Sequence, residues 1–392
     1  MSKVYIVSAK RTPMGSFGGK LASFSATALG SKAISGAINT ANIDPLHIDE
    51  VFFGNVCSAN LGQAPARQAA LGAGISNEVP CTTINKVCSS GMKSIMFGAQ
   101  SIALGQADII VAGGMESMSN IPYYVPEMRW GTKFGGSEIV DGLQKDGLID
   151  AYDHQAMGNS GDATAEKYGF TREDQDSYAI RSYKRAAEAT ENGLFKDEIV
   201  AVEIPQRKGD PIILNEDEEY KNVKFEKISA LRPAFSKTGT VTAANASTLN
   251  DGASALILAS EAAIKKYGLT PIAEVISYAD AAHEPTWFTT APTKAAPKAL
   301  KRANMELSDV DLFEVNEAFS SVAMAFSAEL NVNQDTMNVH GGAVALGHPL
   351  GCSGARITTT LIHAMANRDQ EIGCATLCNG GGGASAIVVR RV

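Results

Sequence analysis

Residues 85–93 read Asn-Lys-Val-Cys-Ser-Ser-Gly-Met-Lys and mark a change from extended to helical sequence. The run before them, 81–85, is typical of a short strand. After them, apolar residues recur with a period of about 3.6, the repeat of a helix. The sequence therefore predicts a helix that begins just after Cys88 and has its apolar face at Met92, Ile95, Met96, Ala99, Ile102 and Ala103.

Cys88 occupies the predicted start of this helix. The dipole and free backbone N–H groups at a helix N-terminus can lower the pKa of a thiol from about 8.5 toward neutrality and make it a nucleophile. A lone cysteine is more often a buried structural residue. Two later segments favour the reactive interpretation: Gly347-His348-Pro349, and Cys378 with the glycines at 380–383.

Length and composition restrict the class of protein. With 392 residues, 45% of them hydrophobic, the chain can bury a large core and build two or three domains. The net charge of −8 argues against binding to nucleic acid or to a membrane surface. No apolar run is long enough to span a membrane, so we expect no membrane insertion.

The six cysteines show no regular framework and no Cys-x-x-Cys pair, which argues against structural zinc and favours reduced thiols. The first residues, Met-Ser-Lys-Val-Tyr, lead almost directly into a predicted strand and leave no room for a targeting segment. We therefore expect a cytoplasmic protein.

Apolar strands alternate with amphipathic helices along most of the chain, which indicates an α/β fold. Residues 119–248 differ, being richer in charge, Tyr, Pro and Asn, and helix starts are expected there at Asp162 and Thr171. Strands are predicted at 4–8, 49–55, 107–114, 250–258, 312–315, 372–378 and 384–390. Helices are predicted at 25–40, 63–73, 171–192, 261–267, 293–303, 318–330 and 353–365.

Two short repeats suggest an internal duplication. Gly-Ala-Ser-Ala occurs at 252–255 and again at 383–386, 131 residues later, and Phe-Phe-Gly-Asn at 52–55 parallels Phe-Glu-Val-Asn at 313–316, 261 residues later. The difference between the offsets equals the length of segment 119–248. We therefore predict a first half (1–118 with 249–270), an insertion (119–248) and a second half (271–392). An offset of 261 pairs Cys88 with position 349, beside His348.

These residues permit a defined chemistry. A nucleophilic thiol needs a base, and a histidine that titrates near neutrality and is held in a Gly-Pro turn suits that role. The four glycines point to exposed N–H groups that form an oxyanion hole. A phosphate-binding loop fits poorly because the glycines lead into a strand. Two thiols and one imidazole suit a two-step acyl transfer, whereas a cysteine hydrolase would need one thiol.

At these residues the chain resembles the thiolase family, in particular its acetoacetyl-CoA thiolases. The resemblance implies a five-layer α-β-α-β-α fold of two duplicated halves with an inserted lid that binds coenzyme A. The matching segments span the chain in the family's order: 87–93, 113–119, 242–247, 316–319, 341–351 and 378–383.

The resemblance also implies roles for five residues. Cys88, activated by His348, takes the acetyl group from one acetyl-CoA, and Cys378 removes a proton from the methyl group of a second. His348 and a water on Asn316 hold the enolate oxygen, and the N–H groups of Cys88 and Gly380 form the other oxyanion hole. The expected product is acetoacetyl-CoA, with coenzyme A as substrate and product and no cofactor required for the chemistry.

Further positions match those that line the coenzyme A and acyl pocket in the family. Many short-chain thiolases have His-Met-Gly where this chain has Ala156-Met157-Gly158, so His154 is a candidate substitute. The charge run 216–227 is either a solvated face or a nucleotide contact, and the resemblance favours the contact through Lys227, helped by Lys221 and Lys224. The predicted lining residues are Met157, Lys227, Leu231, Phe235, Ala243, Ser247, Phe288, Ala318 and Phe319.

Some relatives bind potassium, and the matching residues here are Tyr183, Ala243, Ala244, Ala246 and Val344. The resemblance further implies a homotetramer. Two other members of the family remain alternatives: a degradative thiolase for longer chains, disfavoured by the bulky Phe288 and Met157, and a non-catalytic relative, disfavoured because all the catalytic groups are present.

Overall fold

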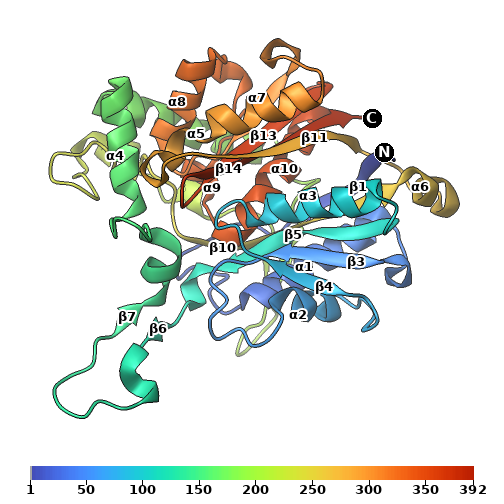
Figure 1. Ribbon diagram of the computed structural model, residues 1–392, viewed down its shortest axis with the longest axis horizontal. Helices are drawn as coiled ribbons and strands as arrows, with labels where there is room; N and C mark the ends of the chain where they lie inside the picture. The colour runs from blue at the N-terminus through green and yellow to red at the C-terminus, as the bar shows by residue number, and fades with distance from the viewer. Residues whose placement is uncertain (1) are drawn as a thin grey trace.

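The computed structural model describes residues 2–392 (Figure 1). Five strands form the sheet of the first half in the order β4-β3-β5-β10-β1. β4, β3 and β5 run parallel, whereas β10 and β1 pair antiparallel. Their bounds are Cys81–Ile84 (β4), Glu50–Gly54 (β3), Ile109–Ser117 (β5), Asn250–Ser260 (β10) and Val4–Arg11 (β1), with Gly15–Ser16 (β2) paired to β10.

The second half repeats this order as β12-β13-β14-β11. β12 and β13 are parallel, and β14 and β11 continue antiparallel. A parallel bridge from Phe313 to Met337 takes the place of β4. The bounds are Leu312–Val315 (β12), Ile372–Asn379 (β13), Gly383–Arg391 (β14) and Ala273–Ala282 (β11). The predicted duplication is thus confirmed in the strand order.

Helices and sheets stack in five layers (Figure 1). α3 (Ser90–Ala103) and α10 (Leu350–Asn367) lie between the sheets, α1 (Ala26–Ala41) and α2 (Pro65–Gly72) cover the first sheet, and α7 (Pro292–Arg302) and α8 (Ser320–Leu330) cover the second. The sheets also join at one edge, where Tyr5 and Ile6 of β1 pair with Glu274 and Ala273 of β11.

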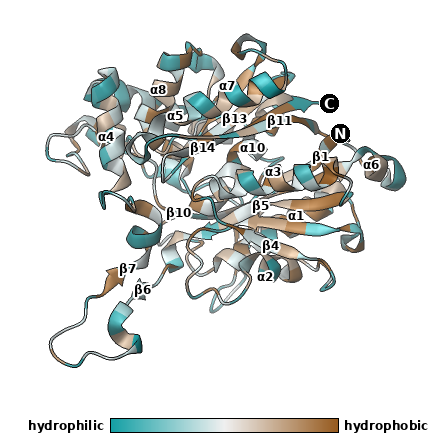
Figure 2. Ribbon diagram, viewed as in Figure 1, coloured by the Kyte–Doolittle hydropathy of each residue, from teal (hydrophilic) through white to brown (hydrophobic). Residues whose placement is uncertain are grey.

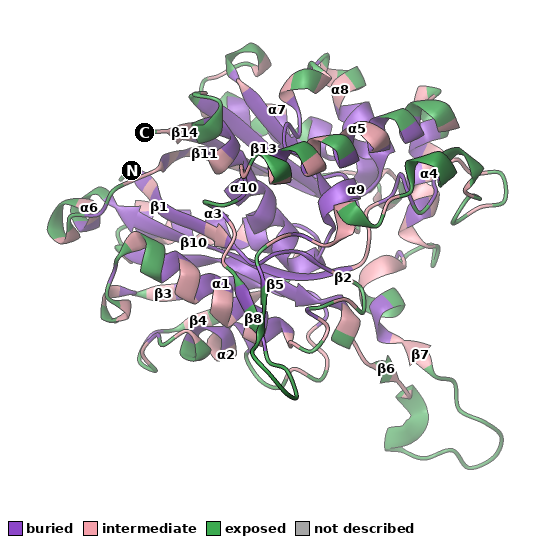
Figure 3. Ribbon diagram, turned by 180° about the vertical axis from the view of Figure 1, so that it is seen from behind, coloured by how far each residue is buried: buried purple, intermediate pink, exposed green. Residues whose placement is uncertain are grey.

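The sheets and central helices form the hydrophobic core. Figure 2 shows hydrophobic residues along the strands, and Figure 3 shows the same strands and α10 as buried. One cluster packs around α3 and α10, and separate clusters lie under α1 and α7. Burying both sheet faces explains why the strands read as continuous apolar runs.

α3 and α10 pack closely because glycines face the partner helix. A Cβ on Gly91 would lie 2.8 Å from Ala355 N, and one on Gly354 would lie 2.4 Å from Met92 N. The two contacts are equivalent in the two halves, because adding 263 to a residue number in α3 gives its counterpart in α10. Ser90-Gly91-Met92-Lys93 thus corresponds to Ser353-Gly354-Ala355-Arg356. The predicted offset of 261 was therefore wrong for the helices, and Cys88 corresponds to Gly351 because the intervening connection is two residues longer in the second half.

A long insertion separates β5 from β10, whereas only residues 380–382 separate the equivalent β13 and β14. The boundaries 1–118 with 249–270, 119–248 and 271–392 stay a prediction. The insertion contains β6 (Tyr123–Tyr124), β7 (Val140–Asp141), α4 (Met157–Tyr168), α5 (Arg172–Glu191), β8 (Val202–Ile204), β9 (Ile212–Leu214), a π-helical turn at Gln144–Leu148, and 3₁₀ turns at Met118–Asn120, Pro126–Arg129, Glu219–Lys221 and Phe225–Ala230.

The predicted helix start at Asp162 was wrong, because α4 begins five residues earlier at Met157. The start at Thr171 is confirmed by a capping box, in which Thr171 and Asp174 each satisfy the other's backbone N–H. The remaining elements are α6 (Glu261–Tyr267), α9 (Ala343–Leu346), and 3₁₀ turns at Pro45–His47, Pro285–Thr290, Leu307–Asp309 and Gln334–Thr336.

Candidate active site

Cys88 lies two residues before the first turn of α3, on a constrained segment. Val87 has a φ of +48°, a conformation that β-branched residues rarely adopt. The segment is held on both sides of Val87, since Lys86 N donates to Ser90 Oγ at 2.8 Å and Lys86 Nζ lies 2.6 Å from Asp280 Oδ1 on β11. The second half thus helps to position the thiol.

Burial raises the pKa of the Cys88 thiol to about 12. The N–H groups of Gly380 and of Cys88 itself point at the sulfur and lower the pKa, but burial outweighs them. The prediction of a lowered pKa was therefore wrong for this state. The thiol is protonated at neutral pH and needs a base.

The four-glycine turn brings bare backbone to Cys88, as predicted. Gly381 and Gly382 have φ values of +83° and +87°, and a Cβ on Gly382 would lie 2.1 Å from His283 O. Gly380 is not forced to be glycine, because a Cβ there would meet Met157 Cε only at 3.4 Å. Its contribution is the N–H that faces the Cys88 sulfur.

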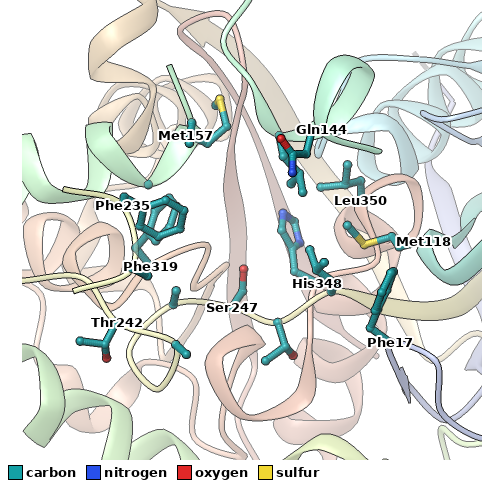
Figure 4. Close-up of a pocket in the computed structure, with 18 of the residues that line it drawn as sticks. Phe17, Met118, Gln144, Met157, Phe235, Thr242, Ser247, Phe319, His348 and Leu350 are labelled. Carbon is teal, nitrogen blue, oxygen red and sulfur yellow. The ribbon is translucent and has the colours of Figure 1, made fainter. Parts of the chain in front are cut away.

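His348 lies in the turn between α9 and α10, where Gly347 has a φ of +102°. Its N–H donates to Asn250 Oδ1 at 3.0 Å, and its ring projects into a cavity (Figure 4). Nδ1 lies 2.6 Å from Ser353 Oγ, which is also 2.9 Å from Pro349 O. When the hydroxyl donates to Pro349, Nδ1 carries the hydrogen and Nε2 offers a lone pair; when it donates to Nδ1, Nε2 becomes the donor.

The His348 ring is neutral at physiological pH. Burial, reinforced by the charge of Arg356, lowers its pKa to about 3. The expectation of a pKa near neutrality was wrong, because no carboxylate lies close enough to offset the desolvation. Nε2 is buried and has no partner among residues 2–392, so it is available to a ligand as base or donor.

Asn316 and Cys378 complete the group. Asn316 Nδ2 lies 3.4 Å from His348 Nδ1, and Asn316 N donates to Thr376 O at 3.0 Å on the strand that ends in Cys378 and Asn379. The pKa of Cys378 is raised well above its usual value by burial and then by the electrostatic repulsion that its thiolate would meet from an ionised Cys88. The structure thus brings the predicted catalytic residues together.

A cavity of about 650 Å³ opens above His348 (Figure 4). Phe235 and Phe319 form one wall, with ring centroids 6.0 Å apart and planes perpendicular. Of the predicted lining residues, five lie here: Met157, Phe235, Ala243, Ser247 and Phe319, together with Ala246 from the predicted potassium set. Phe288 and Ala318 lie beneath, in a buried apolar cluster with Cys378.

A neighbouring cavity of about 260 Å³ shares Glu219, Asn222, Ala243 and Thr248 with the first. It contains further predicted residues: Tyr183, Lys224, Lys227, Leu231 and Ala244. Val344 packs in a buried cluster with Tyr183. Lys221 instead pairs with Glu216 at 2.7 Å. His154 is exposed and lines neither cavity, so Ala156 is not replaced by it.

Sequence reasoning missed part of the cavity wall. These residues come from five separate segments and share no pattern with one another along the chain, so only folding brings them together. They are Phe17, Met118, Gln144, Leu148, Leu249 and Leu350.

His340 is a second buried imidazole and leads to a prediction about stability. It is 1% exposed, and burial lowers its pKa to about 4. Below about pH 6.5 the unfolded chain binds a proton that the folded chain does not, so acidification from pH 7 to 5 should lower the free energy of unfolding by about 2 kcal/mol through this group. In urea unfolding, the free energy of unfolding of His340→Phe should differ less between pH 7 and pH 5 than that of wild type. A difference equal to that of wild type would contradict this account.

The site can be compared with known proteins. The N-terminal thiolase domain matches residues 4–262, and the C-terminal thiolase domain matches residues 269–391. The chain belongs to the thiolase family. This thiolase is 56% identical to an acetyl-CoA acetyltransferase of Schizosaccharomyces pombe, covering 100% of this chain and 99% of that protein. It is 54% identical to the cytosolic acetyl-CoA acetyltransferase ERG10 of Gibberella zeae, covering 99% and 98%.

Solved structures agree on the fold. The Acat5 thiolase of Ascaris suum, crystallised with coenzyme A, superposes with a TM-score of 0.95 at 48% identity, covering 100% of both chains. The Bacillus anthracis acetyl-CoA acetyltransferase gives a TM-score of 0.97 at 39% identity, covering 100% of this thiolase and 99% of that chain. The predicted five-layer thiolase fold is therefore confirmed.

No helix within residues 2–392 combines the length and apolar character that a membrane crossing requires. No group of three or more His, Cys, Asp or Glu side chains in that range is arranged to hold a metal ion.

Proposed function

We propose that this thiolase is an acetyl-CoA acetyltransferase, which condenses two acetyl-CoA molecules to acetoacetyl-CoA and free coenzyme A, and catalyses the reverse thiolysis. The observation that carries the proposal is the gathering of two buried thiols and one neutral imidazole, with the imidazole lining a cavity whose other walls are mostly apolar. The names of the relatives from Schizosaccharomyces pombe and Gibberella zeae support the same activity.

In the first step, His348 Nε2 takes the proton of Cys88, and the thiolate attacks the carbonyl carbon of acetyl-CoA. The N–H groups of Gly380 and Cys88 already point at the sulfur, so they lie where a negative oxygen would develop beside it. When the carbon–sulfur bond to coenzyme A breaks, the leaving thiolate takes the proton from His348. The product is S-acetylated Cys88.

In the second step, Cys378 acts as the base for a proton on the methyl group of a second acetyl-CoA. For this Cys378 first releases its own proton to solvent, and one proton is taken up again when Cys88 leaves as a thiolate, so both thiols are restored at the end of the cycle. His348 Nε2–H and a water held by Asn316 donate to the enolate oxygen. The enolate carbon attacks the acetyl carbon on Cys88, and Cys88 leaves as thiolate to regain a proton. Because both steps use one imidazole, the two hydrogen-bonding arrangements of Ser353 suit its two roles.

The acyl group is expected to be short. Phe288 is buried against Cys378, Ala318 and Phe319, and Met157 packs on the same cluster. These bulky side chains occupy the space that a longer acyl chain would need beyond the reacting carbon.

Incubation with acetyl-CoA tests the proposed function. We expect mass spectrometry to find one acetyl group on the Cys88 peptide and chromatography to find acetoacetyl-CoA. Acetylation without acetoacetyl-CoA would indicate a hydrolase or a single-step transferase, and no acetylation would overturn the proposal.

A potassium ion fits the turn 242–246. The carbonyl oxygens of Ala243, Ala244 and Ala246 accept no backbone hydrogen bond from residues 2–392, and the buried Tyr183 lies on the same cavity as Ala243 and Ala244. Such an ion would order the turn that carries Ser247 into the cavity. We therefore expect a higher rate or tighter coenzyme A binding in potassium than in sodium at equal ionic strength; equal values would contradict a potassium site.

We also propose a cytoplasmic homotetramer. The β6–β7 arm, residues 123–141, extends away from the rest of the chain (Figure 1) and carries apolar side chains that are highly exposed in one copy: Tyr123, Met128, Trp130, Phe134 and Ile139. Such a surface favours association with further copies. Analytical ultracentrifugation should give four copies, and a monomer at micromolar concentration would contradict the proposal.

A further inference from the structure

Arg356 is a buried charge that the mechanism above does not use. It lies on α10 and has no exposed surface. Its Nη1 lies 3.6 Å from Glu314 Oε2, and its Nη2 donates to Asn316 Oδ1 at 3.5 Å. No hydrogen bond from its Nε or Nη1 is found among residues 2–392. Burying a guanidinium with such loose pairing is costly, so its position calls for a reason beyond packing.

The fold itself does not require a buried cation at this position. Lys93 occupies the equivalent place on α3 in the first half. Its side chain is 18% exposed and reaches outward to Asp280 at 2.7 Å. Arg356 alone turns inward, and it does so in the half that carries Asn316 and His348.

The charge of Arg356 decides how the amide of Asn316 is oriented. The two orientations of an amide have nearly the same shape. With Oδ1 toward the guanidinium, Nδ2 faces His348 Nδ1 at 3.4 Å. The flipped amide would place its NH₂ group against a cation, which is electrostatically unfavourable in a buried site.

This orientation matters for one of the two steps. A donor facing Nδ1 favours the tautomer in which Nδ1 is the acceptor and Nε2 carries the hydrogen. That tautomer donates to an enolate oxygen. The first step instead needs the Nε2 lone pair, so it gains nothing from the orientation.

We propose that Arg356 is a positioning residue for the condensation step, which fixes the Asn316 amide so that it holds His348 in the tautomer that donates from Nε2 to the enolate. This inference rests on the proposed function, because it concerns the second step of that reaction.

The test separates the two half-reactions. Rapid quenching and mass spectrometry give the rate of Cys88 acetylation, and formation of acetoacetyl-CoA by the pre-acetylated enzyme gives the condensation rate. Arg356→Met/Glu314→Leu removes the guanidinium together with its nearest carboxyl group, whose pKa burial raises to about 8, so that neither is left without the other. In this variant acetylation should stay within about threefold of wild type. Condensation should fall about 10- to 100-fold, an effect equivalent to one or two oriented hydrogen bonds to a charged group.

Arg11→Lys is the matched control. Arg11 is also fully buried and pairs with Glu198 and Asp217, and none of these three residues forms a hydrogen bond or an ion pair with Asn316 within residues 2–392. Any loss of folded protein in this variant should lower both rates together and leave their ratio unchanged. In addition, Asn316→Ala should mask the effect of the Arg356 change, because the positioning acts through the amide.

The outcomes are distinct. A proportional loss of both rates in the Arg356 variant, or an unchanged ratio, would overturn the inference while leaving the proposed function intact. The triple variant combines Arg356→Met, Glu314→Leu and Asn316→Ala. If its condensation rate fell by the product of the separate losses, the inference would also be overturned. Failure of wild type to acetylate Cys88 would instead overturn the proposed function.

Discussion

Replacing Cys378 with alanine is expected to abolish acetoacetyl-CoA formation while Cys88 is still acetylated. The side chain of Cys378 is completely buried beside Cys88, and in the proposed mechanism its thiolate serves only to remove a proton from carbon. Loss of a positioned base typically slows a step by 10²–10⁴-fold, and an apolar methyl group cannot substitute. We therefore expect condensation to fall by about 10³-fold, measured as acetoacetyl-CoA formed per acetylated enzyme.

Cys374→Ala is the control for this variant. Cys374 is an equally buried thiol on the same strand, but it packs in the outer cluster under α7. This change should cost stability through a small cavity and leave both steps intact. If Cys378→Ala formed acetoacetyl-CoA at the wild-type rate, Cys378 would have no catalytic role. The reaction would then have to proceed with Cys88 as the only catalytic thiol.

The second large effect is expected at His348. With the pKa of Cys88 raised to about 12, the thiolate fraction at pH 7 is on the order of 10⁻⁵ without a base. His348→Ala should therefore slow acetylation of Cys88 by about 10³-fold or more. The rate of the variant should also rise about tenfold for each pH unit, because the thiolate must then form by ionisation. The measurement is the acetylation rate from pH 6 to pH 9 by quenched mass spectrometry.

His363→Gln provides the comparison. Its ring Nε2 donates to Ala9 O at 2.9 Å, away from the cavity, so this variant should keep the wild-type profile. A His348→Ala variant whose rate did not depend on pH would show that another group activates the thiol. Wild type should show no such slope above pH 6, because the imidazole stays neutral down to about pH 3.

Much of the fold could be predicted because local patterns and global burial agree. α6 and β12 have the predicted bounds, and most other strands and helices begin within a few residues of them. The failures have physical causes. α4 starts at Met157 without a side-chain cap, so the capping pattern at Asp162 was misleading. The helix offset of 263 became visible only from the contacts of Gly91 and Gly354.

The sequence by itself determined the chemistry available to this protein: two thiols, a histidine held in a turn and a run of glycines, arranged on a duplicated α/β frame. These features are local, because residue type and turn conformation follow from a few neighbouring residues. Tertiary structure alone decided the ionisation of these groups. Cys88 lies just before a helix, as expected, yet burial by both halves raises its pKa and lowers that of His348, since desolvation depends on everything packed around a group. The same burial places Arg356 behind Asn316, a contact between residues 40 positions apart that no linear pattern reveals.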